Sequence, residues 1–98
     1  MKRMDIDEYR AANGRSSAAE LIHKHEQMKD RIQAGIEFFR KEALDLQEEN
    51  VPNDDPRMQK LESQVDQFEA WVKVTMDQLE EELAQYDADY RVVRSNWL

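Results

Sequence analysis

The 98-residue chain contains no cysteine, two glycines and two prolines. The absence of cysteine excludes a disulfide framework and thiolate chemistry. The scarcity of glycine and proline means that few residues interrupt helices. There is also no glycine-rich loop of the kind that holds a phosphate group.

Long hydrophobic runs are absent as well. No stretch reaches the roughly 18 apolar residues that a membrane span needs. The charged start of the chain, Met1 to Tyr9, lacks the apolar core of a signal peptide. We therefore expect a cytoplasmic protein without a membrane span, with export without a cleavable signal peptide as the alternative.

Basic residues are few relative to acidic ones, with 14 Lys and Arg against 22 Asp and Glu, for a net charge of −8. Sixteen of the acidic residues lie between residues 36 and 98. An acidic chain repels the phosphates of nucleic acid, so we expect no direct binding to DNA or RNA.

What the sequence does have is helical periodicity. Charged residues make up 37% and hydrophobic residues 40% of the chain, a mixture typical of long helices and coiled coils. Apolar residues recur at steps of three and four along two segments. The first stripe contains Leu21, His25, Met28, Ile32, Ile36, Phe39, Ala43 and Leu46. The second contains Met58, Leu61, Val65, Phe68, Val72, Met76, Leu79, Leu83, Tyr86, Tyr90, Val93 and Trp97, with one stutter between Val72 and Met76.

Capping signals set the predicted ends of the helices. Asp5 with Glu8, and Ser17 with Glu20, form capping-box patterns. Asn13-Gly14 and Asn50 suit left-handed helix stops, and Pro56 suits a first helical turn after a capping Asp54 or Asp55. We predict a short helix at about 5–12, long helices at about 17–50 and 56–95, and a loop at 51–55.

These elements predict a single all-α domain over residues 1–98, built as an antiparallel hairpin of two long, coiled-coil-like helices. Such a hairpin has one seam and no closed interior. Ile22, Phe38, Trp71 and Val74 lie off the two stripes. We therefore expect either assembly into a four-helix bundle, as a homodimer or hetero-oligomer, or the docking of a partner's amphipathic helix.

Residues with catalytic potential have simpler explanations. Glu20 and His23 match the E-x-x-H pattern of di-iron bundles, but the facing stripe offers no inward glutamates. Ser17 is explained by helix capping. His25 lies on the apolar stripe, as a space-filling residue or as a pH-sensitive spacer. We expect no catalytic residue, no cofactor and no metal site.

The residues that we expect to bind a protein partner combine apolar anchors with acidic steering charges. They are Phe68, Trp71, Val74, Glu80, Glu81, Glu82 and Trp97. Trp97 either continues the apolar stripe or belongs to a docking peptide at the C-terminus. The sequence thus predicts a non-enzymatic adaptor, chaperone or inhibitor. The alternatives are a self-assembling structural subunit and an acidic, nucleic-acid-mimicking inhibitor of a DNA-binding protein.

In size and helical layout the chain resembles two groups of bacterial proteins. One consists of small acidic helical chaperones of secretion systems, and the other of secreted helical hairpins with a Trp-x-Gly turn. The turn here, Asn50 to Pro56, has no Trp before a Gly. No functional residue follows from either resemblance.

Overall fold

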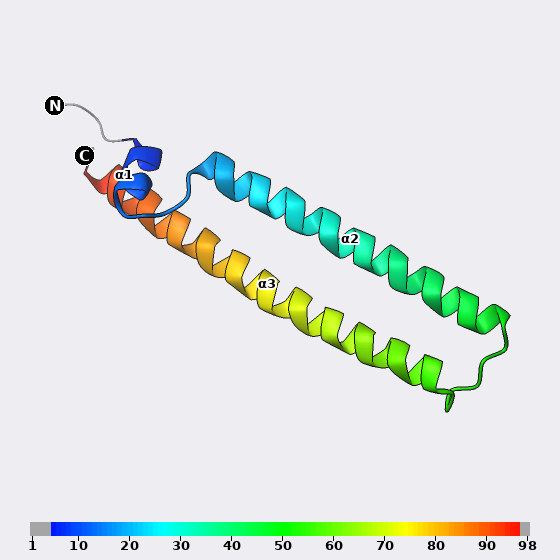
Figure 1. Cartoon of the computed structure of the whole chain (residues 1–98). Coiled ribbons are helices and arrows are strands. Elements are labelled where there is room, and N and C mark those ends of the chain that lie inside the picture. The colour runs from blue at the N-terminus through cyan, green and yellow to red at the C-terminus, as the bar shows by residue number, and fades with distance from the viewer. Residues whose placement is uncertain (1–4, 97–98) are drawn as a thin grey trace. The chain divides into compact units, whose positions relative to one another are not determined.

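The computed structural model describes residues 5–96, which form three α-helices and no strand (Figure 1). The helices are α1 (Ile6–Ala12), α2 (Ala18–Glu48) and α3 (Pro56–Ser95), and α2 contacts α3. The expectation of an all-helical chain with two long helices is confirmed, whereas the four-helix bundle remains a prediction. Within residues 5–96, no helix combines the length and the apolarity that a membrane crossing requires.

The ends of α2 follow the predicted chemistry. The Ser17 hydroxyl accepts a hydrogen bond of 3.2 Å from the backbone N–H of Glu20, which satisfies one of the free donors at the start of the helix. At the other end, Asn50 adopts a left-handed conformation with a φ of 56°. The helix therefore stops two residues before Asn50.

Asp55 provides the cap for α3. Its side-chain Oδ1 accepts a hydrogen bond of 2.9 Å from the backbone N–H of Arg57, and Pro56 is the first helical residue. The capping box predicted at α1 does not form, because the side chain of Asp5 accepts no hydrogen bond at the cap. The predicted stop after α1 is present, with Gly14 at a φ of 71°.

The chain packs as two compact units. The first unit combines the described residues up to Gln27 with those from Asp77 onward, and therefore holds α1, the start of α2 and the end of α3. The second unit is Met28–Met76, which holds the rest of both long helices and their connecting loop. In each unit, the α2 and α3 segments run antiparallel (Figure 1).

The buried and half-buried residues of α3 alternate between three- and four-residue spacings without interruption. They are Met58, Leu61, Val65, Phe68, Val72, Thr75, Leu79, Glu82, Tyr86, Asp89 and Val93. The predicted stutter after Val72 is therefore wrong. These residues form two columns along the face of α3 that meets α2, and within each column every seventh residue recurs. The column that begins at Met58, named a, is apolar throughout. The column named d begins with Leu61 and Phe68 and continues with the polar Thr75, Glu82 and Asp89.

Three apolar residues that the sequence placed on this stripe are exposed instead. Met76 is 40%, Leu83 53% and Tyr90 46% exposed, and each directly follows a polar d residue. They occupy the next heptad column, e, which flanks the seam. Helix α2 departs from its predicted stripe in the same way. Gly35 occupies the position in the seam that the sequence pattern assigned to Ile36, and Ile36 is an e residue that is 47% exposed.

Gly35 is in the seam because Phe68 fills the space beside it. A Cβ atom at position 35 would overlap the Cε2 and Cζ atoms of the Phe68 ring. The aromatic ring therefore occupies space that only glycine leaves open at position 35.

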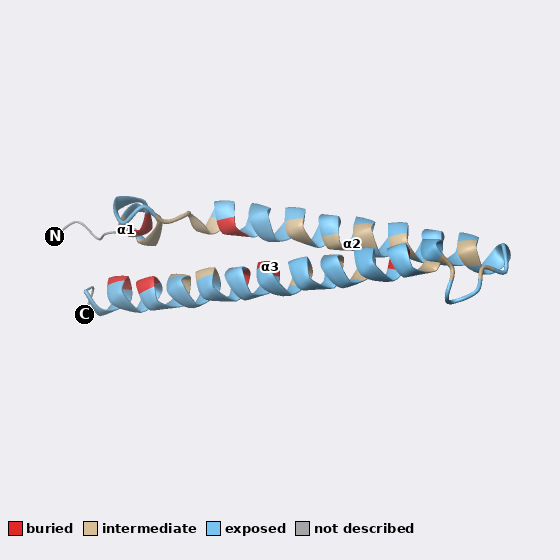
Figure 2. Ribbon diagram, turned by 60° about the horizontal axis from the view of Figure 1, so that its bottom comes forward, coloured by how far each residue is buried: buried red, intermediate tan, exposed pale blue. Residues whose placement is uncertain are grey.

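The hydrophobic core is thin. Among residues 5–96, the buried hydrophobic side chains are Leu21, Leu61, Leu79 and Val93. Figure 2 shows that most of the ribbon of the two long helices is exposed, in pale blue. Within the same range, large hydrophobic side chains with 38–61% exposure are more numerous: Ile22, Ile36, Phe38, Leu44, Trp71, Val74, Met76, Leu83, Tyr90 and Val92. Two helices alone leave much apolar surface in water.

Candidate functional site

An apolar groove lies between α2 and α3 in the first unit and encloses about 490 Å³. Its lining residues are Ala18, Leu21, Ile22, His25 and Glu26 from α2, and Leu79, Leu83 and Tyr86 from α3. The buried side chains of Leu21 and Leu79 belong to the seam, whereas Ile22 and Leu83 are 61% and 53% exposed. The groove is thus open to solvent along its two apolar e residues.

Carboxylates border this groove. Glu26 is one of its lining residues. On α3, the exposed Glu80 and Asp87 lie three residues before and four residues after Leu83, so they neighbour it on the helix surface. Asp87 pairs with Arg91 at 3.1 Å, but both side chains are more than half exposed, so solvent screens that pair.

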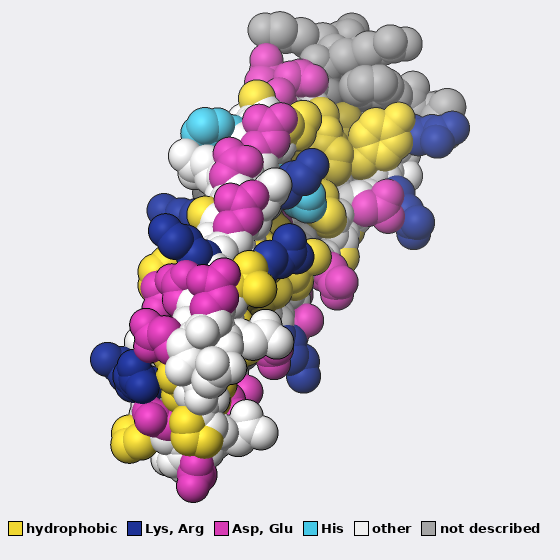
Figure 3. All heavy atoms as spheres, turned by 90° about the vertical axis from the view of Figure 1, so that its right-hand side faces the viewer, with side chains coloured by type: hydrophobic (Ala, Val, Ile, Leu, Met, Phe, Trp, Pro, Cys, Tyr) yellow, Lys and Arg dark blue, Asp and Glu magenta, His cyan; other side chains and the backbone are white. Residues whose placement is uncertain are grey.

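A second groove lies within the second unit and encloses about 470 Å³. It is lined by Ile32, Ile36, Phe39, Val65, Phe68, Glu69, Val72 and Lys73. Its e residues are Ile36 on α2 and Glu69 on α3, so this groove is less uniformly apolar at its edges than the first. Figure 3 shows hydrophobic side chains at the surface with acidic side chains beside them.

Four aromatic rings form a continuous row in the second unit. The ring centroids of Phe38 and Phe39 lie 5.3 Å apart, and those of Phe39 and Phe68 lie 5.4 Å apart. Phe68 in turn stacks on Trp71 at 5.9 Å. The two ends of the row, Phe38 and Trp71, are 55% and 38% exposed. Aromatic pairs at these separations add to the stability of the seam and hold the outer rings in place.

The structure separates the predicted apolar anchors into different environments. Phe68 is a half-buried seam residue, whereas Trp71 and Val74 are exposed, Val74 at 56%. All three belong to the second unit. Trp97 lies outside the described residues.

The predicted acidic residues, which belong to the first unit, also differ among themselves. Glu80 and Glu81 are exposed, as a steering role requires. Glu82 instead occupies a d position, where its Oε1 accepts a hydrogen bond of 2.6 Å from Lys24 Nζ. Its Oε2 is buried without a hydrogen-bond partner in the described chain. Glu82 is therefore a seam residue, which the sequence analysis did not anticipate.

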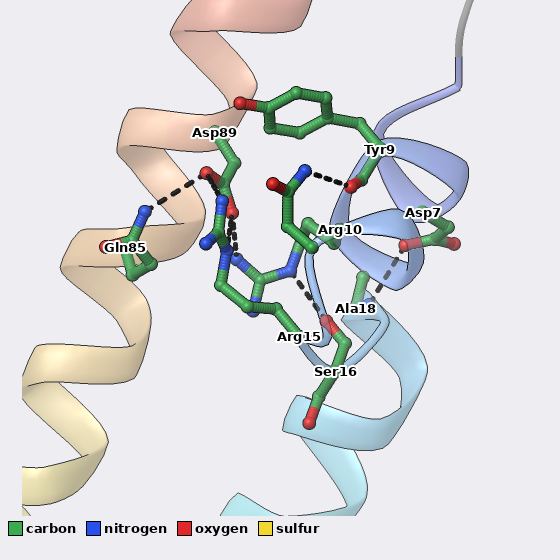
Figure 4. Close-up of polar contacts among 9 residues, drawn as sticks. Asp7, Tyr9, Arg10, Arg15, Ser16, Ala18, Gln85 and Asp89 are labelled. Carbon is green, nitrogen blue, oxygen red and sulfur yellow. Dashed lines mark hydrogen bonds and ion pairs between the residues drawn. The ribbon is translucent and has the colours of Figure 1, made fainter.

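A buried ionic cluster in the first unit joins α1 to α3 (Figure 4). Asp89 Oδ2 accepts hydrogen bonds from Arg10 Nη1 at 2.8 Å and Arg15 Nε at 2.7 Å. Its Oδ1 accepts hydrogen bonds from Arg15 Nη2 at 2.5 Å and Gln85 Nε2 at 3.1 Å. Hydrogen bonding to Arg15, more than any other contact, lowers the pKa of Asp89 below its ordinary value.

Arg10 completes the cluster. Its side chain is 2% exposed, its Nε donates a hydrogen bond of 2.6 Å to the Ser16 carbonyl, and its guanidinium lies 5.0 Å from the centroid of the Tyr86 ring. Sequence reasoning missed this cluster because charged residues were read as solvent-facing. The spacing of the sequence contains a signal for this cluster. Asp89 follows Phe68 by three intervals of seven residues, which places it in the same inward-facing column.

No protein family, curated protein or solved structure matches this chain. The site must therefore be interpreted from its own geometry. Within residues 5–96, no group of three or more His, Asp or Glu side chains is placed to hold a metal ion. Glu20 and His23, which carry the E-x-x-H pattern, are exposed residues of α2. The features that remain are the two grooves, the aromatic row and the acidic border.

Proposed function

We propose that the chain is a non-enzymatic interaction module, and that within each of its two units the exposed e residues beside the α2–α3 seam bind an α-helix of another protein. Adaptor, chaperone and inhibitor roles are all forms of this activity. The observation that carries the proposal is the exposure of Ile22, Ile36 and Leu83 beside a seam with few buried side chains.

The number of apolar columns on a helix indicates how many other helices it packs against. Two helices that pair only with each other need the a and d columns, whereas helices that face a larger bundle carry a third apolar column at e or g. Ile22, Ile36, Met76, Leu83 and Tyr90 supply this third column, and each is at least 40% exposed. Covering apolar surface contributes roughly 25 cal/mol per Å², so a further helix on the e residues is favourable.

The same column favours one alternative, a structural subunit that self-assembles into a four-helix bundle. A nucleic-acid-mimicking inhibitor has less support, because Glu82 forms an ion pair with Lys24. The run from Glu80 to Glu82 is therefore not a uniform array of free charges.

Two substitutions on one helix test the proposal. Ile36 at the e position and Leu44 on the outer surface of α2 are 47% and 51% exposed, so an aspartate at either position is tolerated similarly by the isolated fold. We expect the wild-type chain and Leu44→Asp to retain a stoichiometric partner through purification from the cells that make it. Ile36→Asp should lose that partner.

Light scattering on the purified chain separates the two forms of the proposal. A monomer that gains mass only with its partner supports the binding module, and a stable dimer that Ile36→Asp dissociates supports the structural subunit. Equal behaviour of Ile36→Asp and Leu44→Asp in both measurements contradicts the proposal.

A further inference from the structure

The groove of the first unit has a chemistry that identifies the kind of helix it accepts. Resting on the proposed function, we infer that this groove is the docking site of a basic amphipathic helix, with aliphatic residues on one face and Lys or Arg along its edges.

The apolar part of the recognition comes from Ile22 and Leu83. They are the exposed e residues of the two helices, above a floor that includes the buried Leu21 and Leu79. The lining residues span 18–26 on α2 and 79–86 on α3, which corresponds to about two helical turns or roughly 12 Å on each side. The enclosed volume of about 490 Å³ lies within the ~300–1,000 Å³ of typical binding clefts.

The charged part comes from the border of the groove. Glu26 lines it, and Glu80 and Asp87 neighbour Leu83 on α3. Lysine or arginine at the edges of a docked helix would meet these carboxylates, which increases the association rate and selects against acidic helices.

One carboxylate of the border, Asp87, pairs with Arg91 at 3.1 Å in an exposed, solvent-screened contact. Glu26 and Glu80 form no ion pair among the described residues, so the border stays acidic.

Lys24 pairs with Glu82 at 2.6 Å, so its charge is partly offset at the edge of the seam. Arg10 and Arg15 are both held by Asp89. These three cations are thus committed to contacts inside the unit.

A second copy of the chain fits this groove less well. A two-fold symmetric contact brings the same patch of both copies together, so the carboxylates of Glu26, Glu80 and Asp87 on one copy would lie against an equally acidic patch on the other. Like charges across an interface oppose binding, whereas a basic helix supplies the missing counter-charges. Charge complementarity therefore selects a basic helix over a second copy.

Three synthetic helical peptides test the inference with the full chain. The first carries leucine on one face and lysine along the edges, the second replaces each lysine with glutamate, and the third has the leucine–lysine composition in scrambled order. We expect the first to bind in a fluorescence anisotropy titration, at least about tenfold more tightly than the other two. Raising the salt concentration should weaken its binding.

Variants of the chain locate the binding. Ile22→Ser and Leu83→Ser change exposed residues, so the fold should persist in circular dichroism, and each should weaken binding about tenfold. The variant Glu80→Gln should also weaken binding and reduce its salt dependence. The matched control is Glu81→Gln, which removes the same charge next to Glu80 on another face of α3 and should change the affinity by less than about twofold.

Each other outcome overturns the inference in a distinct way. If Glu81→Gln weakens binding as much as Glu80→Gln does, attraction to the net charge explains the result. Equal binding of the glutamate peptide removes the charge argument but leaves the groove as a helix-binding site. If no peptide binds and Ile22→Ser dissociates a dimer in light scattering, a second copy is the occupant. The proposed function is tested separately by Ile36→Asp, whose substitution lies in the second unit. If this variant retains its partner as Leu44→Asp does, the proposed function fails whatever the peptides show.

Discussion

Arg10 and Asp89 are 79 residues apart in the sequence, yet they form an ion pair of 2.8 Å with side chains that are 2% and 3% exposed. The pair fixes the seven-residue helix α1 to the end of α3 within the first unit. A buried charge is tolerated only when its hydrogen bonds are satisfied, and Asp89 receives hydrogen bonds on both of its oxygens.

Removing Asp89 should therefore destabilise the fold strongly. In Asp89→Ala, the Arg10 guanidinium is left buried without its carboxylate, and we expect the free energy of unfolding to fall by about 3–5 kcal/mol. Urea denaturation followed by circular dichroism measures this change. The control is Asp87→Ala, because Asp87 and Arg91 form an exposed pair whose loss should matter by less than about 1 kcal/mol. Equal effects of the two substitutions would refute the role of burial.

The same cluster predicts a loss of stability in acid. The pKa of Asp89 in the folded chain is lowered from 3.8, chiefly by its hydrogen bonding to Arg15. A carboxyl group with a lowered folded pKa contributes stability that is fully present above its unfolded pKa and is lost as the pH falls through the folded pKa. We expect the free energy of unfolding to decrease as the pH drops below about 4.

The variant Asp89→Asn isolates this contribution. It has no carboxyl group to protonate at position 89, so its stability should change less between neutral and acidic pH than that of the wild type. A smaller acid dependence should remain, because Arg57 also lowers the pKa of Asp55. Urea denaturation at a series of pH values gives the comparison, and identical pH profiles of variant and wild type would exclude the cluster as the source.

Gly35 should resist replacement by alanine. Alanine at an open position in a helix stabilises by about 1 kcal/mol relative to glycine. At position 35 its Cβ would overlap the Phe68 ring, which is packed between Phe39 and Trp71. Overpacking costs about 1–3 kcal/mol, so we expect Gly35→Ala to lower the free energy of unfolding.

A second substitution checks the cause of that effect. Leucine at position 68 lacks the ring atoms that the new Cβ would meet. In a Phe68→Leu background, Gly35→Ala should therefore raise the free energy of unfolding. The explanation fails if Gly35→Ala stabilises the chain that retains Phe68.

Glu82 offers the opposite opportunity. One of its carboxylate oxygens is buried without a partner, and Lys24, its partner at the other oxygen, is 52% exposed. Glu82→Leu would fill a d position with an apolar side chain, and Lys24 would remain solvated because it is already half exposed. We expect a gain in the free energy of unfolding of about 1–2 kcal/mol in urea denaturation. Glu81→Leu, at an exposed position, should change it by less than about 0.5 kcal/mol. A loss of stability in Glu82→Leu would show that the ion pair is worth more than apolar packing.

The positions of the helices could be predicted from the sequence because their end signals are local. Ser17, Asn50 and Pro56 act on the backbone of their immediate neighbours, so the observed ends of the long helices lie within two residues of the expected ones. Periodicity also identified the apolar a column of α3, where every residue is hydrophobic.

The other seam column could not be read in the same way. A search for apolar residues at helical spacing passes over polar seam positions and selects the apolar residue beside each one. It therefore selects Met76, Leu83 and Tyr90 in place of Thr75, Glu82 and Asp89. This one-residue displacement predicts a stutter that the structure does not contain. Two of these polar residues are accommodated by partners distant in the sequence, Glu82 by Lys24 and Asp89 by Arg10. The three residues that this reading assigned to the seam are the exposed e residues of the proposed binding surface.

The most direct test of the central claim places a photo-activatable cross-linking residue at Ile36 or at Leu44 in the chain produced in its own cells. The two positions lie on one helix with similar exposure, and only Ile36 flanks the seam. If another protein's helix covers the e residues, a discrete heavier adduct should form from position 36 and not from position 44. Equal adduct yields from both positions, or none from position 36, would contradict the account.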